Sequence, residues 1–154
     1  MRSLVTSPRP KLLMMKTVRL HHDYSAPVER LFDHLAEHEN LAPLFGTRTE
    51  RVRDGDAERN GVGSVRRLSF GGLMPFEETV TVFVPNERIE YRISKGTPMR
   101  DHIGVMEFSS TPSGGSQLDY AISFDAAVPG LAAVVAAAVQ RSVSRGLAKL
   151  GGSL

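Results

Sequence analysis

The chain has 154 residues, 41% of them hydrophobic and 23% charged, and this length predicts one domain with a single hydrophobic core. It contains no cysteine, which excludes disulfides, thiolate nucleophiles and cysteine-ligated metal centres and is consistent with a reducing cytoplasm. The net charge is +2, but Arg2, Arg9 and Lys11 lie in the first thirteen residues, and without them it becomes −1.

We expect residues 1–13 to form a flexible tail and residues 14–154 to form one domain. Two prolines interrupt the tail, and its apolar run is too short for a signal peptide. The longest apolar run, Val128 to Val139, also contains a proline and falls short of the roughly twenty apolar residues that cross a bilayer. We therefore expect a cytoplasmic protein without integral membrane association.

The first patterned segments predict a strand and two helices. Residues 16–24 alternate between apolar and polar side chains, as in a half-buried strand. An amphipathic helix follows Pro27, with apolar residues at positions i, i+3, i+4 and i+7. A second short helix contains Leu44 and Phe45 and ends at Gly46.

The arginine-rich segment that comes next, residues 48–59, is expected to form a solvated surface. Its four arginines are interleaved with four acidic residues. A protein that binds a phosphate backbone needs a concentrated basic face. The charge pattern therefore predicts no nucleic-acid partner.

Six further strands and a C-terminal helix are predicted, and turn signals between the strands favour an antiparallel meander. The strands cover residues 47–53, 63–70, 77–84, 88–94, 102–109 and 117–125. The helix covers residues 129–150 and carries an apolar row of Leu131, Val135, Val139, Val143 and Leu147. This order predicts an α+β fold in which a seven-stranded antiparallel sheet packs against the long helix.

The C-terminal helix is rich in alanine, and small side chains fill little of the space beneath a curved sheet. That space can form a ligand cavity. Alternatively, the alanines only allow the helix to approach the sheet closely. Composition does not distinguish the two interpretations.

Four segments carry a resemblance to a known superfamily. They are YSAPVERLF at residues 24–32, GVGSVR at 61–66, RIEYRI at 88–93 and Pro129-Gly130 before the last helix. Their order and spacing over residues 15 to 150 resemble the SRPBCC superfamily, which includes START-related lipid-transfer domains and polyketide cyclase/dehydrase-like proteins. The resemblance implies a helix-grip fold, with the sheet wrapped around the helix and enclosing a cavity for a hydrophobic small molecule. It implies little about chemistry, because members include both carriers and enzymes.

A formal H-x-x-E-H motif occurs at His34, Glu37 and His38. On a helical wheel both histidines flank the buried stripe and Glu37 faces solvent, so we expect exposed histidines and no metal. The glycines match no dinucleotide-binding or P-loop pattern, and no serine lies in a Gly-x-Ser-x-Gly elbow. We therefore expect no cofactor.

The candidate ligand-binding residues occupy inward-facing positions of the strands and of the second helix. They are Leu44, Phe45, Arg67, Tyr91, His102, Met106 and Tyr120. An inward Arg67 would need a carboxylate partner or an anionic ligand group, unless a register error of one residue places it outside. Tyrosine and histidine in such positions also occur as ordinary core residues.

Two functional hypotheses follow. The first is a carrier or sensor that binds a lipid, a polyketide or another hydrophobic molecule. The alternative is a cyclase or dehydratase in which Tyr91, His102 or Tyr120 moves protons at a carbonyl substrate and Arg67 stabilises an oxyanion. The sequence offers no dense cluster of acids and bases, which favours binding. A third possibility is a protein-interaction role, which would appear as an exposed apolar patch. A second copy of the chain, forming a homodimer, is the other partner considered.

Overall fold

The computed structural model describes residues 15–154, so the tail predicted for residues 1–13 lies outside the described residues. The helical elements are α1 (Val28–Ala36), the 3-10 turn η2 (His38–Leu41), α2 (Ala42–Phe45), α3 (Leu131–Leu150) and the 3-10 turn η3 (Gly151–Ser153). The strands are β1 (Lys16–Tyr24), β2 (Arg48–Arg53), β3 (Val65–Phe70), β4 (Leu73–Val84), β5 (Arg88–Lys95), β6 (Met99–Ser110) and β7 (Ser116–Ala126). None of the described helices has the length and apolarity required to cross a membrane.

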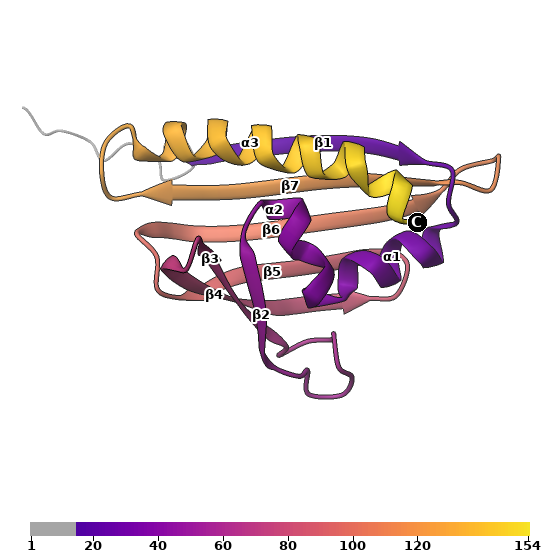
Figure 1. Ribbon diagram of the computed structural model, residues 1–154, viewed down its shortest axis with the longest axis horizontal. Helices are drawn as coiled ribbons and strands as arrows, with labels where there is room; N and C mark the ends of the chain where they lie inside the picture. The colour runs from indigo at the N-terminus through magenta and orange to yellow at the C-terminus, as the bar shows by residue number, and fades with distance from the viewer. Residues whose placement is uncertain (1–14) are drawn as a thin grey trace, which may run out of the picture.

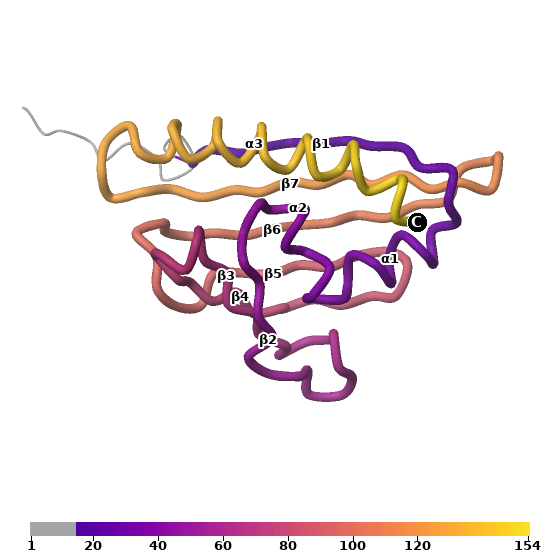
Figure 2. The backbone as a smooth tube through the Cα atoms, in the orientation of Figure 1, coloured from indigo at the N-terminus to yellow at the C-terminus, as the bar shows by residue number. Residues whose placement is uncertain are grey.

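The seven strands form one antiparallel sheet in the order β1-β7-β6-β5-β4-β3-β2, which confirms the predicted helix-grip fold. In Figure 1, α3 runs along β1 and β7, while α1 and α2 lie over the middle of the sheet. The backbone trace in Figure 2 follows the sheet from β1 to the β2 edge, where a long loop leads into β3. One face of the sheet is thus covered by helices from both ends of the chain.

Two strands begin three or more residues earlier than predicted. β4 starts at Leu73, because Gly71 and Gly72 both adopt positive φ and close a tight hairpin in which Phe70 pairs with Leu73. β6 starts at Met99, which pairs with Ala126 at the end of β7. Tertiary pairing therefore extends both strands into segments whose local pattern is not strand-like.

The first helix closes one end of the core. Its predicted apolar residues are all buried, and the Phe32 ring meets the rings of Phe83 and Phe108 edge-on at centroid distances of 5.2 and 5.0 Å. At the same end, the Tyr24 hydroxyl donates a hydrogen bond of 2.9 Å to the Leu147 carbonyl and so ties β1 to α3.

The two halves of α3 pack differently. In the C-terminal half, Val143 and Leu147 are buried, Ser142 Oγ donates to the Phe45 carbonyl at 2.9 Å, and Gly146 lies against Leu44. In the N-terminal half, the members of the apolar row are only partly buried; they are Leu131, Val135 and Val139. The helix is thus anchored to α2 at one end and held less deeply at the other.

We expect Gly146→Ala to destabilise the protein by about 1 to 3 kcal/mol. A Cβ there would lie 2.6 Å from the Leu44 carbonyl oxygen and 2.7 Å from its Cα, and backbone atoms cannot move aside cheaply. Urea unfolding monitored by circular dichroism measures the change. Gly152→Ala is the control, because a Cβ at Gly152 meets no atom within 4 Å. Equal stability of both variants would contradict the close α2–α3 contact.

Candidate functional site

Six of the seven predicted residues lie on the helix-covered side of the sheet. Leu44, Tyr91, His102, Met106 and Tyr120 are buried, and Phe45 is partly buried against the core. Alternation along β6 and β7 is confirmed, because His102, Met106 and Phe108 share one buried face, as do Leu118, Tyr120, Ile122 and Phe124.

The inward orientation expected for Arg67 is wrong. Its side chain is 46% exposed and lies 3.8 Å from Glu77 on the outer face. The inward arginine is Arg66, whose side chain is only 3% exposed. Alternation is a poor guide to the faces of β3, because a register shift between Leu68 and Phe70 leaves two adjacent residues, Leu68 and Ser69, both buried.

Arg66 is held by a buried ion pair at the centre of the inner face. Its Nε donates to Glu78 Oε2 at 2.7 Å, from the directly opposite position on β4. Its guanidinium carbon lies 4.5 Å from the centroid of the Tyr91 ring and 5.9 Å from that of Phe45. Arg66 Nη2 is buried and has no hydrogen-bond partner in the described structure. One donor of the guanidinium is therefore left unsatisfied inside the protein.

His102 lies beside this group as a neutral ring. Its Nδ1 accepts the backbone N–H of Ile93 at 3.1 Å, so in the neutral ring the proton is assigned to Nε2, which faces Glu78 Oε1 at 4.0 Å. Burial lowers the pKa of His102 below its usual value. The ring is therefore uncharged at neutral pH.

Two tyrosines complete the cluster. The hydroxyls of Tyr91 and Tyr120 form a hydrogen bond with each other. Burial raises the pKa of both phenols above the ordinary tyrosine value, so both stay protonated at neutral pH. Gly104 makes room for Tyr91, because a Cβ at this position would overlap the Tyr91 ring. We call Arg66, Glu78, Tyr91, His102 and Tyr120 the inner polar cluster.

His38 is also buried, contrary to the expected exposed position. The helix α1 ends at Ala36, and an extended Glu37 turns the chain so that His38 is 1% exposed. Its Nε2 lies 3.2 Å from Ser64 Oγ, and burial, followed by the charge of Arg66, lowers the pKa of His38 to about 3. His34 stays on α1 and half-buried. Among residues 15–154, no three His, Cys, Asp or Glu side chains gather in a way that could hold a metal ion.

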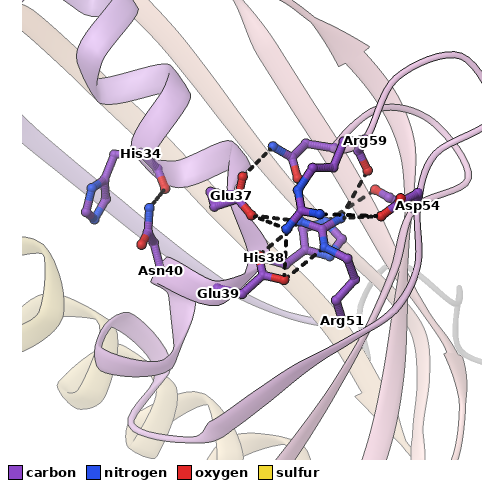
Figure 3. Close-up of polar contacts among 10 residues, drawn as sticks. His34, Glu37, His38, Glu39, Asn40, Arg51, Asp54 and Arg59 are labelled. Carbon is purple, nitrogen blue, oxygen red and sulfur yellow. Dashed lines mark hydrogen bonds and ion pairs between the residues drawn. The ribbon is translucent and has the colours of Figure 1, made fainter.

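An ion-pair network holds this turn in place, and Figure 3 shows it around Arg51. The Arg51 side chain is 12% exposed, and it donates to Glu37 at 3.0 Å, to Glu39 at 2.9 Å and to Asn60 at 2.6 Å. Arg59 adds a contact to Glu37 at 3.0 Å. The expectation that residues 48–59 form a solvated surface is therefore partly wrong. Arg51 is mostly buried, and it connects the segment after α1 to β2 and to the β2–β3 loop.

The space around the inner polar cluster is closely packed. Tyr91, Met106 and Tyr120 are each at most 2% exposed. Two grooves are open to solvent elsewhere: one of about 370 Å³ on the outer face of β1, β7 and β6, and one of about 340 Å³ beside α2 and α3. A cavity lined by the inner row and the alanines of α3 stays a prediction.

Removal of the buried charge tests the Arg66 assignment. Arg66→Met leaves Glu78 without its partner, and we expect a loss of about 3 to 5 kcal/mol in unfolding free energy. Adding Glu78→Leu should recover most of it, because no unpaired charge then remains. The control Arg67→Met should change stability by less than about 0.5 kcal/mol. A larger effect at Arg67 than at Arg66, measured in urea, would reverse the assignment.

The network around Arg51 predicts a pH dependence. Hydrogen bonding, first with Glu39 and then from Asn60 and Arg59, lowers the pKa of Glu37 to about 2. Because the folded-state pKa is below the unfolded value, the stabilisation is present at neutral pH and is lost as the pH falls from about 4.5 towards 2. Glu37→Gln should therefore cost about 1 kcal/mol at pH 7 and less in acid. Unfolding across this range checks it, with exposed Glu87→Gln as the control; a pH-independent difference would contradict it.

Comparison with solved structures shows the same fold in proteins of low sequence identity. A Thermobifida fusca protein is 16% identical with a TM-score of 0.70, and the alignment covers 90% of this chain and 94% of that one. A Nitrosospira multiformis protein is 18% identical with a TM-score of 0.66, covering 87% and 95%. Ara h 8.0201 is 14% identical with a TM-score of 0.65, covering 91% and 99%. At these identities the likeness concerns the fold alone.

Comparison with curated protein sequences finds no match. Residues 15–153, however, match the sequence profile of the family described as polyketide cyclase/dehydrase and lipid transport. This match spans nearly the whole described chain and agrees with the helix-grip fold of the solved structures. The protein therefore belongs to the polyketide cyclase/dehydrase and lipid transport family, within the SRPBCC superfamily.

Proposed function

We propose that the protein binds a hydrophobic small molecule, such as a lipid or a polyketide, between the sheet and α3. An oxygen atom of that molecule would accept a hydrogen bond from Arg66. The unsatisfied Arg66 Nη2, buried within the inner polar cluster, is the observation that carries the proposal. Family membership supports it, because the family description includes lipid transport.

The packing of α3 supports the same proposal. Its N-terminal half is held less deeply than its C-terminal half, and its small side chains offer little to fill the interior. A modest outward movement of this half would open space above the inner polar cluster without breaking the α2–α3 contact. The ligand would then pack against Leu131, Val135 and Val139, which are only partly buried against the core.

One end of the sheet offers an apolar rim for entry. Phe70, Leu73 and Met74 at the β3–β4 hairpin are exposed, as are Val128 and Val134 at the start of α3. The antiparallel order brings these segments to the same end, because Met99 pairs with Ala126 and Gly96 lies against Pro75 (Figure 1). Exposed apolar groups of this kind favour contact with a hydrophobic partner. A protein-interaction role would use the same rim.

A cyclase or dehydratase is the second candidate, because four polar side chains converge around Arg66: Glu78, Tyr91, His102 and Tyr120. Arg66 and the two neutral phenols could stabilise an oxyanion. A proton acceptor is harder to identify. The Nδ1 lone pair of His102 is occupied by the Ile93 N–H, and the Glu78 carboxylate is paired with Arg66. We therefore rank binding above catalysis.

The test combines a ligand measurement with a stability measurement. Native mass spectrometry of the full chain purified from its own host should show a co-purified hydrophobic molecule. A fluorescent fatty acid should bind the stripped protein more tightly than its methyl ester, because the ester lacks the charge that Arg66 favours.

Met106→Trp should abolish binding of that probe with little loss of stability, because the proposed space that opens beneath α3 would accept the larger ring. The control Val105→Trp lies on the opposite face of β6 and should leave binding unchanged. In a solid core, Met106→Trp would instead overpack and cost about 1 to 3 kcal/mol. That loss, together with a wild-type protein that never binds the probe, would overturn both the carrier and the enzyme proposals.

A further inference from the structure

A row of cations follows the outer side of α3 in its C-terminal half. Arg141, Arg145 and Lys149 are spaced four residues apart, so they lie on one side of the helix. All three are exposed, and among the described residues none of them has an acidic partner or another polar contact. The helix itself contains no aspartate or glutamate. Every charge on its outer side is therefore positive.

These cations border the groove of about 340 Å³ beside α2. The rest of the groove is lined by Pro43, Ala138, Ser142 and Gly146. Ser142 donates its hydroxyl to the Phe45 carbonyl, and Gly146 is in close contact with Leu44. The uncharged lining thus serves the α2–α3 contact, and the positive charge is left to face an external partner.

The same side of the helix becomes apolar towards its N-terminus. Ala138 is exposed one turn before the first cation, and Val134, one turn earlier, is 68% exposed. We call Val134, Ala138, Arg141, Arg145 and Lys149 the α3 stripe. It combines exposed apolar groups with unpaired cations along one side of one helix, and groups of both kinds interact favourably with a membrane interface.

We propose that the α3 stripe docks the protein on the surface of an anionic phospholipid membrane. The spacing of the charges favours an extended surface over a single small anion. At 1.5 Å per residue, Arg141 and Lys149 are separated by about 12 Å along the helix axis, too far for all three cations to surround one phosphate. Neighbouring anionic headgroups can meet them separately, and each cation near such a surface adds to the attraction.

A nucleic acid fits this surface less well. The α3 helix has no aromatic side chain on which bases could stack, and the exposed valine and alanines have no role against a phosphate backbone. A bilayer interface accommodates both parts of the stripe. The inference concerns an outer surface and does not rest on the proposed ligand site.

The experiment is sedimentation of the full chain with vesicles, either of phosphatidylcholine alone or of phosphatidylcholine and phosphatidylglycerol in equal parts. We expect binding to the anionic vesicles only, weakening as salt is added. Arg141→Gln, Arg145→Gln and Lys149→Gln together should weaken binding by at least about tenfold. Using the full chain in every arm keeps the contribution of Arg2, Arg9 and Lys11 constant.

The matched control carries Arg19→Gln, Arg30→Gln and Lys95→Gln, which removes the same charge from exposed positions elsewhere. It should weaken binding by no more than about twofold. Val134→Ser should also weaken binding, but without changing its salt dependence. Thermal unfolding of each variant shows whether the fold is retained.

The proposal is overturned if the wild-type protein ignores anionic vesicles, or if the stripe variant and its control bind equally. Competition by inorganic phosphate beyond that of sodium chloride at matched ionic strength would instead assign the groove to a free phosphate. Binding of an acidic protein or of RNA through the same three cations, without vesicle binding, would assign another partner. Fatty-acid binding measured without vesicles stays independent of all these results.

Discussion

The buried ion pair between Arg66 and Glu78 is the constraint on which the inner side of this protein depends. A guanidinium cannot be left inside an apolar core without a carboxylate or an equivalent partner. Glu78 supplies that partner from the neighbouring strand, directly opposite in the β3–β4 register. Tyr91 stacks on the cation and contacts Tyr120, and His102 turns its Nε2 towards the same carboxylate. Polar side chains from five strands, one of them Arg66 itself, thereby form one cluster.

A second group of charged residues, around Arg51, keeps the segment of α1, η2 and α2 in position over this cluster. Arg51 joins the segment after α1 to β2 and to the β2–β3 loop, and the turn it stabilises directs His38 towards Ser64. This network is largely peripheral and costs less desolvation than the Arg66–Glu78 pair. The two groups thus act at different depths: one fixes the chemistry of the inner face and the other fixes what covers it.

The long helix α3 packs differently in its two halves. Its C-terminal half is locked by Gly146, Ser142 and the Tyr24 hydroxyl, whereas its N-terminal half is only partly buried beside an exposed apolar rim. This difference in burial is what our proposed opening of an interior site depends on. Its outer side carries unpaired cations, so the same element could both cover a ligand and contact a charged surface.

Local pattern determined most of the architecture. Alternation located β1, β6 and β7, helical spacing located α1 and α3, and Gly46 marked the end of α2, because these signals depend on a few neighbouring residues. Tertiary structure alone decided which arginine faces inward, since strand pairing places Arg66 opposite the buried Glu78 and the irregularity after Leu68 interrupts the alternation of β3. It also decided the burial of His38, because the turn after Ala36 depends on Arg51, which lies fourteen residues from Glu37. The sequence alone does not identify Glu78 as a site residue either, because a carboxylate in a strand becomes informative only when strand pairing places it opposite a buried cation.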